Sequence, residues 1–225
     1  MKQFRKREQP MGENSGWTRD LGLQFFGKVS ASISHEMKNV LAIINENVGL
    51  LEDLAYIAEK GQPIDPERMK KTCLNMTRQI KRGDTIMKNL NIFAHSIDEA
   101  NKDIDLFRLV ELVASLASRR AALRSVSLVV REPAVPVSLL GNPFLLQNFL
   151  WLCLEEVIET VQSGTELLLS VEKEENCSSI IIQGDGGPVF AAGKEMKTVP
   201  AAMLAELRAA VKTRGDGRKL LLSLH

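Results

Sequence analysis

Two long segments of the sequence repeat apolar or small residues at alternating steps of three and four, the spacing of one face of an α-helix. The first repeat covers residues 26–55 and the second covers residues 69–97. Between them, residues 61–63 (Gly-Gln-Pro) interrupt the pattern, and Asp65 and Pro66 restart it as an N-cap and a proline in the first helical turn. Two such helices joined by a short loop predict an antiparallel helical hairpin.

The predicted helices carry more apolar surface than one hairpin can bury. Each is several turns longer than the roughly 11–12 residues of a typical globular helix. The seam of the first helix consists of Phe26, Val29, Ile33, Met37, Val40, Ile44, Val48, Leu51 and Ala55, and further apolar residues widen it. Pairing two hairpins into a four-helix bundle would bury this surface, so we expect a homodimer.

After residues 101–103 the pattern changes to alternating helices and strands. We expect helices at residues 106–124, 143–161 and 201–212, and strands at residues 127–130, 166–172 and 179–183, with a turn at 174–176. Such an order predicts a small α/β sandwich of one sheet and a helical layer. The expected fold is therefore α+β: a flexible N-terminus (1–20), a hairpin that forms a dimeric four-helix bundle (21–100), and an α/β domain (104–225).

The composition excludes several classes of protein. A hydrophobic fraction of 44% and a net charge of +1 indicate a folded chain and give no reason to expect a nucleic-acid partner. The short basic start is more typical of a solvated terminus than of a membrane-binding patch. No stretch approaches the ~18 apolar residues of a spanning helix, so we expect no membrane contact and a cytoplasmic location. The three cysteines lie far apart, which argues against disulfides or zinc and favours small buried hydrophobes.

A group of polar residues around His35 is the strongest candidate for chemistry in the first helix. His35 lies two residues after Ile33 of the seam, about 200° round the helix and therefore off the buried stripe. His35 and Asn39 are i, i+4 neighbours and share a face. An exposed imidazole near neutral pH is a competent nucleophile for a phosphoryl group, and the adjacent Glu36 could accept or orient its ring proton. The alternative is an ordinary surface histidine.

Residues 32–41, Ser-Ile-Ser-His-Glu-Met-Lys-Asn-Val-Leu, resemble the phosphoacceptor box of two-component histidine kinases. In that family a helix of a dimeric bundle carries a His-Glu pair, with Asn or Thr four residues after the His. The resemblance implies that His35 carries a phosphoryl group, that Glu36 handles a proton and that Asn39 places a hydrolytic water. His95 and His225 have no counterpart in this box and are expected to be bystanders.

The second half resembles the ATP-binding domain of the same kinases, with departures. Residues 140–143 (Leu-Gly-Asn-Pro) look like the strand and turn that precede a helix bearing a magnesium-holding Asn. In the alignment we prefer, Glu156 takes the place of that Asn. Glutamate is also an oxygen ligand for Mg²⁺, but it adds negative charge beside a triphosphate. Glu156 is therefore the candidate metal and cofactor residue.

Two glycine clusters resemble the nucleotide boxes of that domain in part. Asp185 and Gly187 match an Asp-x-Gly-x-Gly box whose Asp reads the adenine amino group, although Val189 replaces the second glycine. Gly215 and Gly217 resemble the later glycine box, which Arg-Lys interrupts here. Tight turns explain both clusters as well. The resemblance therefore implies ATP and magnesium binding that is weak or absent.

Three functions remain open at this point. The favoured one is a phosphorelay protein that resembles histidine phosphotransferases of the kinase-like type and exchanges a phosphoryl group between His35 and aspartates of response-regulator receiver domains. The second is an active, ATP-dependent cytoplasmic histidine kinase. The third is a non-catalytic dimeric scaffold or kinase inhibitor.

Overall fold

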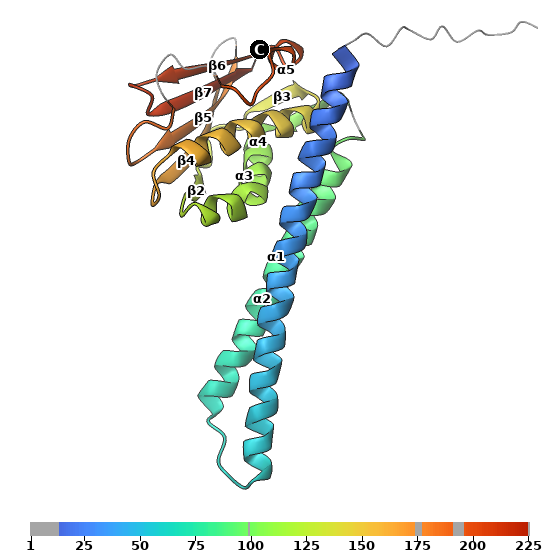
Figure 1. Cartoon of the computed structure of the whole chain (residues 1–225), viewed down its shortest axis with the longest axis vertical. Coiled ribbons are helices and arrows are strands. Elements are labelled where there is room, and N and C mark those ends of the chain that lie inside the picture. The colour runs from blue at the N-terminus through green and yellow to red at the C-terminus, as the bar shows by residue number, and fades with distance from the viewer. Residues whose placement is uncertain (1–13, 99, 174–176, 191–195, 225) are drawn as a thin grey trace, which may run out of the picture.

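A computed structural model of the chain describes residues 14–98, 100–173, 177–190 and 196–224. The predicted turn at residues 174–176 and residues 1–13 of the predicted flexible terminus (1–20) lie outside these residues, and residues 14–20 of that segment belong to a helix. Helix α1 (Asn14–Glu59) and helix α2 (Pro66–His95) form the expected antiparallel hairpin (Figure 1). The predicted cap is confirmed, because the Glu67 N–H donates to Asp65 Oδ1 over 2.9 Å.

The buried face of α1 is shifted slightly from the predicted seam. Phe25, Val29, Ile33, Val40 and Leu54 are buried apolar residues within 20–59 of this helix, whereas the predicted Phe26 and Val48 are exposed. The shift places Phe25 toward the α/β domain, as described below. Large apolar residues also remain exposed on α2, among them Met69, Ile80 and Met87. One hairpin therefore leaves apolar surface open, as the sequence indicated.

The α/β domain contains two sheets. Strands β1 (Lys102–Asp105) and β3 (Ser138–Gly141) pair antiparallel. The larger sheet has the order β2-β4-β5-β7-β6, formed by β2 (Ser127–Val130), β4 (Glu166–Lys173), β5 (Ser178–Gly184), β7 (Lys219–Leu224) and β6 (Ala209–Arg214). Only the β2–β4 pair in it is parallel. Helices α3 (Leu106–Leu123) and α4 (Pro143–Thr160) pack with this sheet around one apolar core, which confirms the predicted sandwich.

One predicted helix is wrong. The chain between residues 201 and 212 forms the short α5 (Ala201–Glu206) and then enters β6. Arg208 has a φ of +49°, which ends the helical turn, and Ala209 pairs with Leu224 of β7. Antiparallel pairing with β7 makes this segment a strand, although its local sequence pattern is helical. Such pairing often outweighs local pattern in short apolar segments. Strands β1 and β7 were also not predicted.

An aromatic cluster joins the hairpin to the α/β domain, which lies beside one end of the hairpin (Figure 1). The ring centroid of Phe25 lies 5.2 Å from that of Phe93, 5.5 Å from that of Phe144 and 5.7 Å from that of Trp151. These rings come from α1, α2 and α4 and belong to the same buried core as the sheet. Among the described residues, no helix is both long and apolar enough to cross a membrane.

Candidate functional site

The residues around His35 divide between solvent and the helix interface as the helical period predicts. His35 and Asn39 are exposed on α1, one turn apart. Glu36 instead turns toward α2 and is only 9% exposed. One of its carboxylate oxygens, Oε2, lies 3.6 Å from Arg82 Nη2. His35 is therefore open to a partner, while the residue beside it contacts the second helix.

The environment of Glu36 changes its acidity. Burial raises the pKa of this carboxyl group above its ordinary value of 4.5, and the charges of Arg82 and Arg119 oppose the rise only in part. Arg119 belongs to α3, so the field at Glu36 comes from both the hairpin and the α/β domain. A raised pKa makes Glu36 a better proton acceptor than an exposed glutamate, which suits a residue placed beside a histidine that gains and loses charge.

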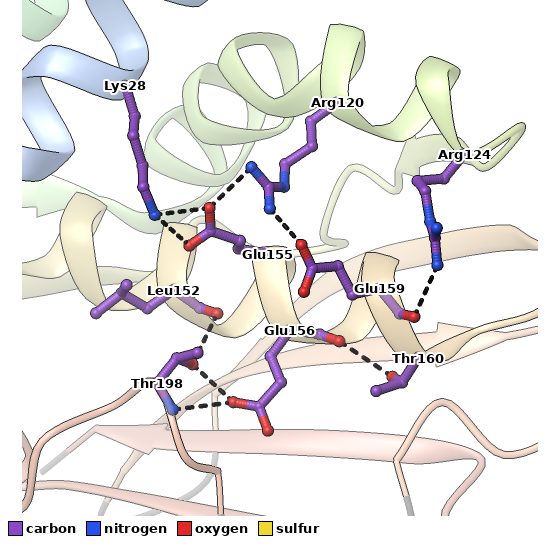
Figure 2. A network of polar contacts seen from close by, with 9 residues as sticks. All are labelled: Lys28, Arg120, Arg124, Leu152, Glu155, Glu156, Glu159, Thr160 and Thr198. Atoms are coloured by element: carbon purple, nitrogen blue, oxygen red, sulfur yellow. Dashed lines mark hydrogen bonds and ion pairs between the residues drawn. The ribbon is translucent and has the colours of Figure 1, made fainter.

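Glu156, the predicted magnesium ligand, is 8% exposed and accepts several hydrogen bonds from the chain itself (Figure 2). Its Oε2 accepts from the N–H of Thr198 over 3.1 Å and from the Thr198 hydroxyl over 2.7 Å. Its Oε1 accepts from the N–H of Lys197 over 3.3 Å. The carboxylate thus holds the segment before α5 against α4.

The first glycine cluster is also engaged in contacts within the chain. Asp185 is exposed, and its Oδ1 accepts from the N–H of Glu166 over 2.9 Å. Gly187 has a φ of +140°, a conformation that favours glycine. Val189, which stands where the resemblance expects the second glycine, is buried in the core.

The second glycine cluster forms the turn between β6 and β7. Gly215 and Gly217 have φ values of +62° and +84°. The carbonyl of Gly217 accepts from the N–H groups of Val189 and Phe190 over 2.8 and 3.1 Å. A Cβ at Gly217 would lie 2.1 Å from the carbonyl oxygen of Phe190. The two glycine clusters therefore contact each other directly.

This arrangement does not fit a magnesium-bound triphosphate. The oxygens of Glu156 already face N–H and O–H donors, and one oxygen of Asp185 is bonded to β4. A buried carboxylate with several donors has no further need of a cation to offset its charge.

A second acidic network on α4 was not found from the sequence. Glu155 is 7% exposed; its two oxygens lie 2.8 and 2.9 Å from Lys28 Nζ of α1, and Oε1 lies 2.9 Å from Arg120 Nη1 of α3 (Figure 2). Arg120 also pairs with Glu159, whose backbone carbonyl accepts from Arg124 over 3.1 Å. The only sequence signal was three glutamates within an otherwise apolar helix.

The other histidines and the cysteines differ in their surroundings. His95 is exposed, with Nδ1 2.8 Å from Asp98 Oδ2, and His225 is outside the described residues. Burial raises the pKa of the Cys153 thiol well above its ordinary value, which makes it unreactive. Cys73, in contrast, is exposed, so the expectation of buried thiols is wrong for this residue.

No protein-family model matches the sequence, and no curated protein matches it. Similar solved structures include the histidine kinase AdeS of Acinetobacter baumannii, at 15% identity and a TM-score of 0.45, over 84% of this chain and 95% of that one. The histidine kinase ThkA in complex with response regulator protein TrrA is similar at 15% identity and a TM-score of 0.46, over 96% of this chain and 67% of that one. The cytoplasmic segment of histidine kinase QseC is similar at 12% identity and a TM-score of 0.43, over 67% of this chain and 92% of that one. These similar structures are of histidine kinases, the family that the residues around His35 resemble.

Proposed function

We propose that this chain is a two-component phosphorelay protein that carries a phosphoryl group on His35. The observation that supports the proposal most is the placement of three side chains along one turn of α1. His35 and Asn39 face solvent, whereas Glu36 between them is buried against Arg82. A surface histidine followed by a buried acid that is paired with Arg82 suits a nucleophile that must meet a large partner.

The proposed reaction is an exchange with a receiver aspartate. The lone pair of one ring nitrogen of His35 attacks the phosphorus of an aspartyl phosphate, and a P–N bond forms. The P–O bond to the aspartate breaks, and its electrons leave with the carboxylate. The other ring nitrogen keeps its proton, so the phosphorylated ring becomes cationic. Transfer to a second receiver reverses these steps.

Nucleotide plays no part in the proposed function. The residues that would hold Mg·ATP by resemblance are Glu156, Asp185, Gly187, Gly215 and Gly217, and the first two accept hydrogen bonds within the chain. Weak or absent ATP binding is therefore part of the proposal. A calorimetric titration that finds micromolar Mg·ATP affinity, together with autophosphorylation of His35, would instead favour a histidine kinase.

The proposed working unit is a homodimer formed by the two hairpins. Its support is the large apolar side chains that one chain leaves exposed along one side of each helix: Leu41, Val48 and Tyr56 on α1, and Met69, Ile80 and Met87 on α2. Burying a leucine, isoleucine or methionine side chain contributes about 1.5–3 kcal/mol, so this set is large enough to hold two hairpins together. The occupant proposed for this face is a second copy of the chain.

The test is phosphate transfer from receiver domains. The protein is incubated with a panel of phosphorylated receivers, and acid-labile, base-stable phosphate on the chain is measured. Wild type and the His95→Gln control should acquire such phosphate, and His35→Gln should acquire none while its sedimentation stays unchanged. Phosphate on the His35→Gln variant would refute the site. Absence of phosphate on wild type with every receiver and with ATP would favour a scaffold.

A further inference from the structure

The ion pairs of Glu155 cross between the two parts of the molecule (Figure 2). Glu155 belongs to α4 and is nearly buried, Lys28 belongs to the hairpin, and Arg120 belongs to α3. Lys28 Nζ reaches both oxygens of the Glu155 carboxylate, at 2.8 and 2.9 Å, while its side chain is 46% exposed. We call Lys28, Glu155 and Arg120 the latch.

Lys28 also has a fixed relation to the proposed phosphoacceptor. It precedes His35 by seven residues on the same continuous helix α1. Seven residues are about two turns, so Lys28 and His35 lie on the same side of α1 to within roughly 20° and about 10.5 Å apart along its axis. The α/β domain is therefore attached to the side of the helix that presents His35.

Besides a hydrogen bond that Asn89 Nδ2 of α2 donates to Ser115 Oγ of α3 over 2.7 Å, the two parts share an apolar contact of a different kind. The cluster of Phe25, Phe93, Phe144 and Trp151 is apolar. Apolar contact is non-directional, so such a cluster fixes where the domain is attached more firmly than the angle at which it stands. A lysine that contacts both oxygens of a buried carboxylate is directional, because charge-assisted hydrogen bonds need a set geometry.

We propose that the latch sets the angle of the α/β domain about the aromatic cluster, and that Lys28 is a positioning residue for phosphoryl transfer to His35. This inference rests on the proposed function. With the latch closed, the contact at Lys28 lies two turns before His35, and the exposed His35 side chain stays open to a receiver. Without it, the domain samples other angles on that same side, and a receiver meets His35 in a smaller fraction of molecules.

The variant that isolates this effect is Lys28→Met. It keeps most of the length of the side chain, and Glu155 retains Arg120 as its partner, so the buried carboxylate is not left alone. Lys28→Arg should restore the ion pair. Lys71→Met is the control, because Lys71 is an exposed lysine near the start of α2, far along that helix from Phe93.

Transfer is measured against the concentration of a phosphorylated receiver that labels wild type. Lys28→Met should raise the half-saturating receiver concentration by roughly three- to tenfold, the effect of losing one charge-assisted hydrogen bond that is partly open to water. The maximal rate should stay the same, since no group that touches the reacting atoms has changed. Lys28→Arg and Lys71→Met should behave as wild type. Glu155→Gln removes the ion pairs with both Lys28 and Arg120, so its rise should be at least as large as that of Lys28→Met. Adding Lys28→Met to Glu155→Gln should give no further rise, because the Lys28 pair is already broken.

Labelling of His35 by phosphoramidate separates docking from chemistry. This small donor has no surface to dock, so Lys28→Met should take up its phosphate as fast as wild type. A receiver curve for Lys28→Met that overlays that of wild type would overturn the latch, and so would an equal slowing with both donors. If wild type gains phosphate from neither donor, the proposed function itself fails, which is a different result.

Discussion

Replacing Glu156 by glutamine tests whether this carboxylate braces the chain or remains available as a ligand. Glutamine keeps the volume of the side chain but replaces one acceptor oxygen by a donor NH₂ group. That group would face a backbone N–H, because both carboxylate oxygens of Glu156 accept hydrogen bonds, Oε2 from Thr198 and Oε1 from Lys197. The variant therefore loses at least one hydrogen bond and the charge that strengthens the others.

The expected magnitude follows from the exposure of the two partners. A hydrogen bond to a charged group contributes about 1.5–3 kcal/mol when it is sheltered from water. Lys197 and Thr198 are exposed, so water replaces part of the loss on their side. We therefore expect Glu156→Gln to lower the free energy of unfolding by about 1–2 kcal/mol, or Tm by roughly 2–8 °C for a chain of this size.

Urea unfolding followed by circular dichroism measures this change, and Glu159→Gln is the matched control on the same helix. The Glu159 side chain is 56% exposed in its pair with Arg120, so its loss should cost under about 0.5 kcal/mol. Amide hydrogen exchange at Thr198 should also speed up in the Glu156 variant alone. Equal stability of the two variants, with unchanged exchange at Thr198, would refute the structural role of Glu156 and leave its carboxylate free for a metal.

Three further predictions concern other parts of the molecule. The raised pKa of Glu36 means that folding disfavours its charged form, so wild type should lose stability as pH rises through that pKa. Glu36→Gln should then be more stable than wild type in thermal melts at neutral pH. This advantage should disappear below pH 4.5, where the carboxyl group of wild type is protonated in both the folded and the unfolded state. Gly217→Ala should cost about 2–4 kcal/mol in urea unfolding, because its Cβ meets a backbone oxygen at 2.1 Å, whereas Gly215→Ala has open space and should cost only about 1 kcal/mol for its positive φ. The double variant Leu41→Lys with Ile80→Lys should sediment as a monomer at concentrations where wild type is a dimer, because each lysine would place an unpaired charge in the bundle interface.

The hairpin could be predicted because its signals are local. A repeat of three and four along 30 or so residues, or an Asp-Pro at a helix start, acts within a few residues of the chain. The exposure of His35 followed from the same period, since Ile33 fixed the buried side. The α/β domain beyond β2 was harder, and β6 shows why. Ala209 and its neighbours become a strand through pairing with β7, which no helical or strand pattern in that segment specifies.

The roles of the α4 glutamates could not be predicted for a related reason. Glu155 and Lys28 are 127 positions apart, so their ion pair depends on how two parts of the fold pack. Glu156 was assigned to metal by alignment with a family helix, but the residues that occupy its oxygens lie 41 and 42 positions later. Long-range polar contacts of this kind carry no periodicity, and only the unusual presence of acids in an apolar helix indicates that partners exist.

The aromatic cluster has a consequence for where this chain can be cut. A break near residue 100 separates two regions of sequence but runs through a single core, since Phe25 and Phe93 are almost completely buried against Phe144 and Trp151. A hairpin fragment would expose both phenylalanines, each worth about 1.5–3 kcal/mol of burial. The hairpin is therefore not a transplantable module: a chimaera that borrows it needs either α4 or new polar side chains at positions 25 and 93.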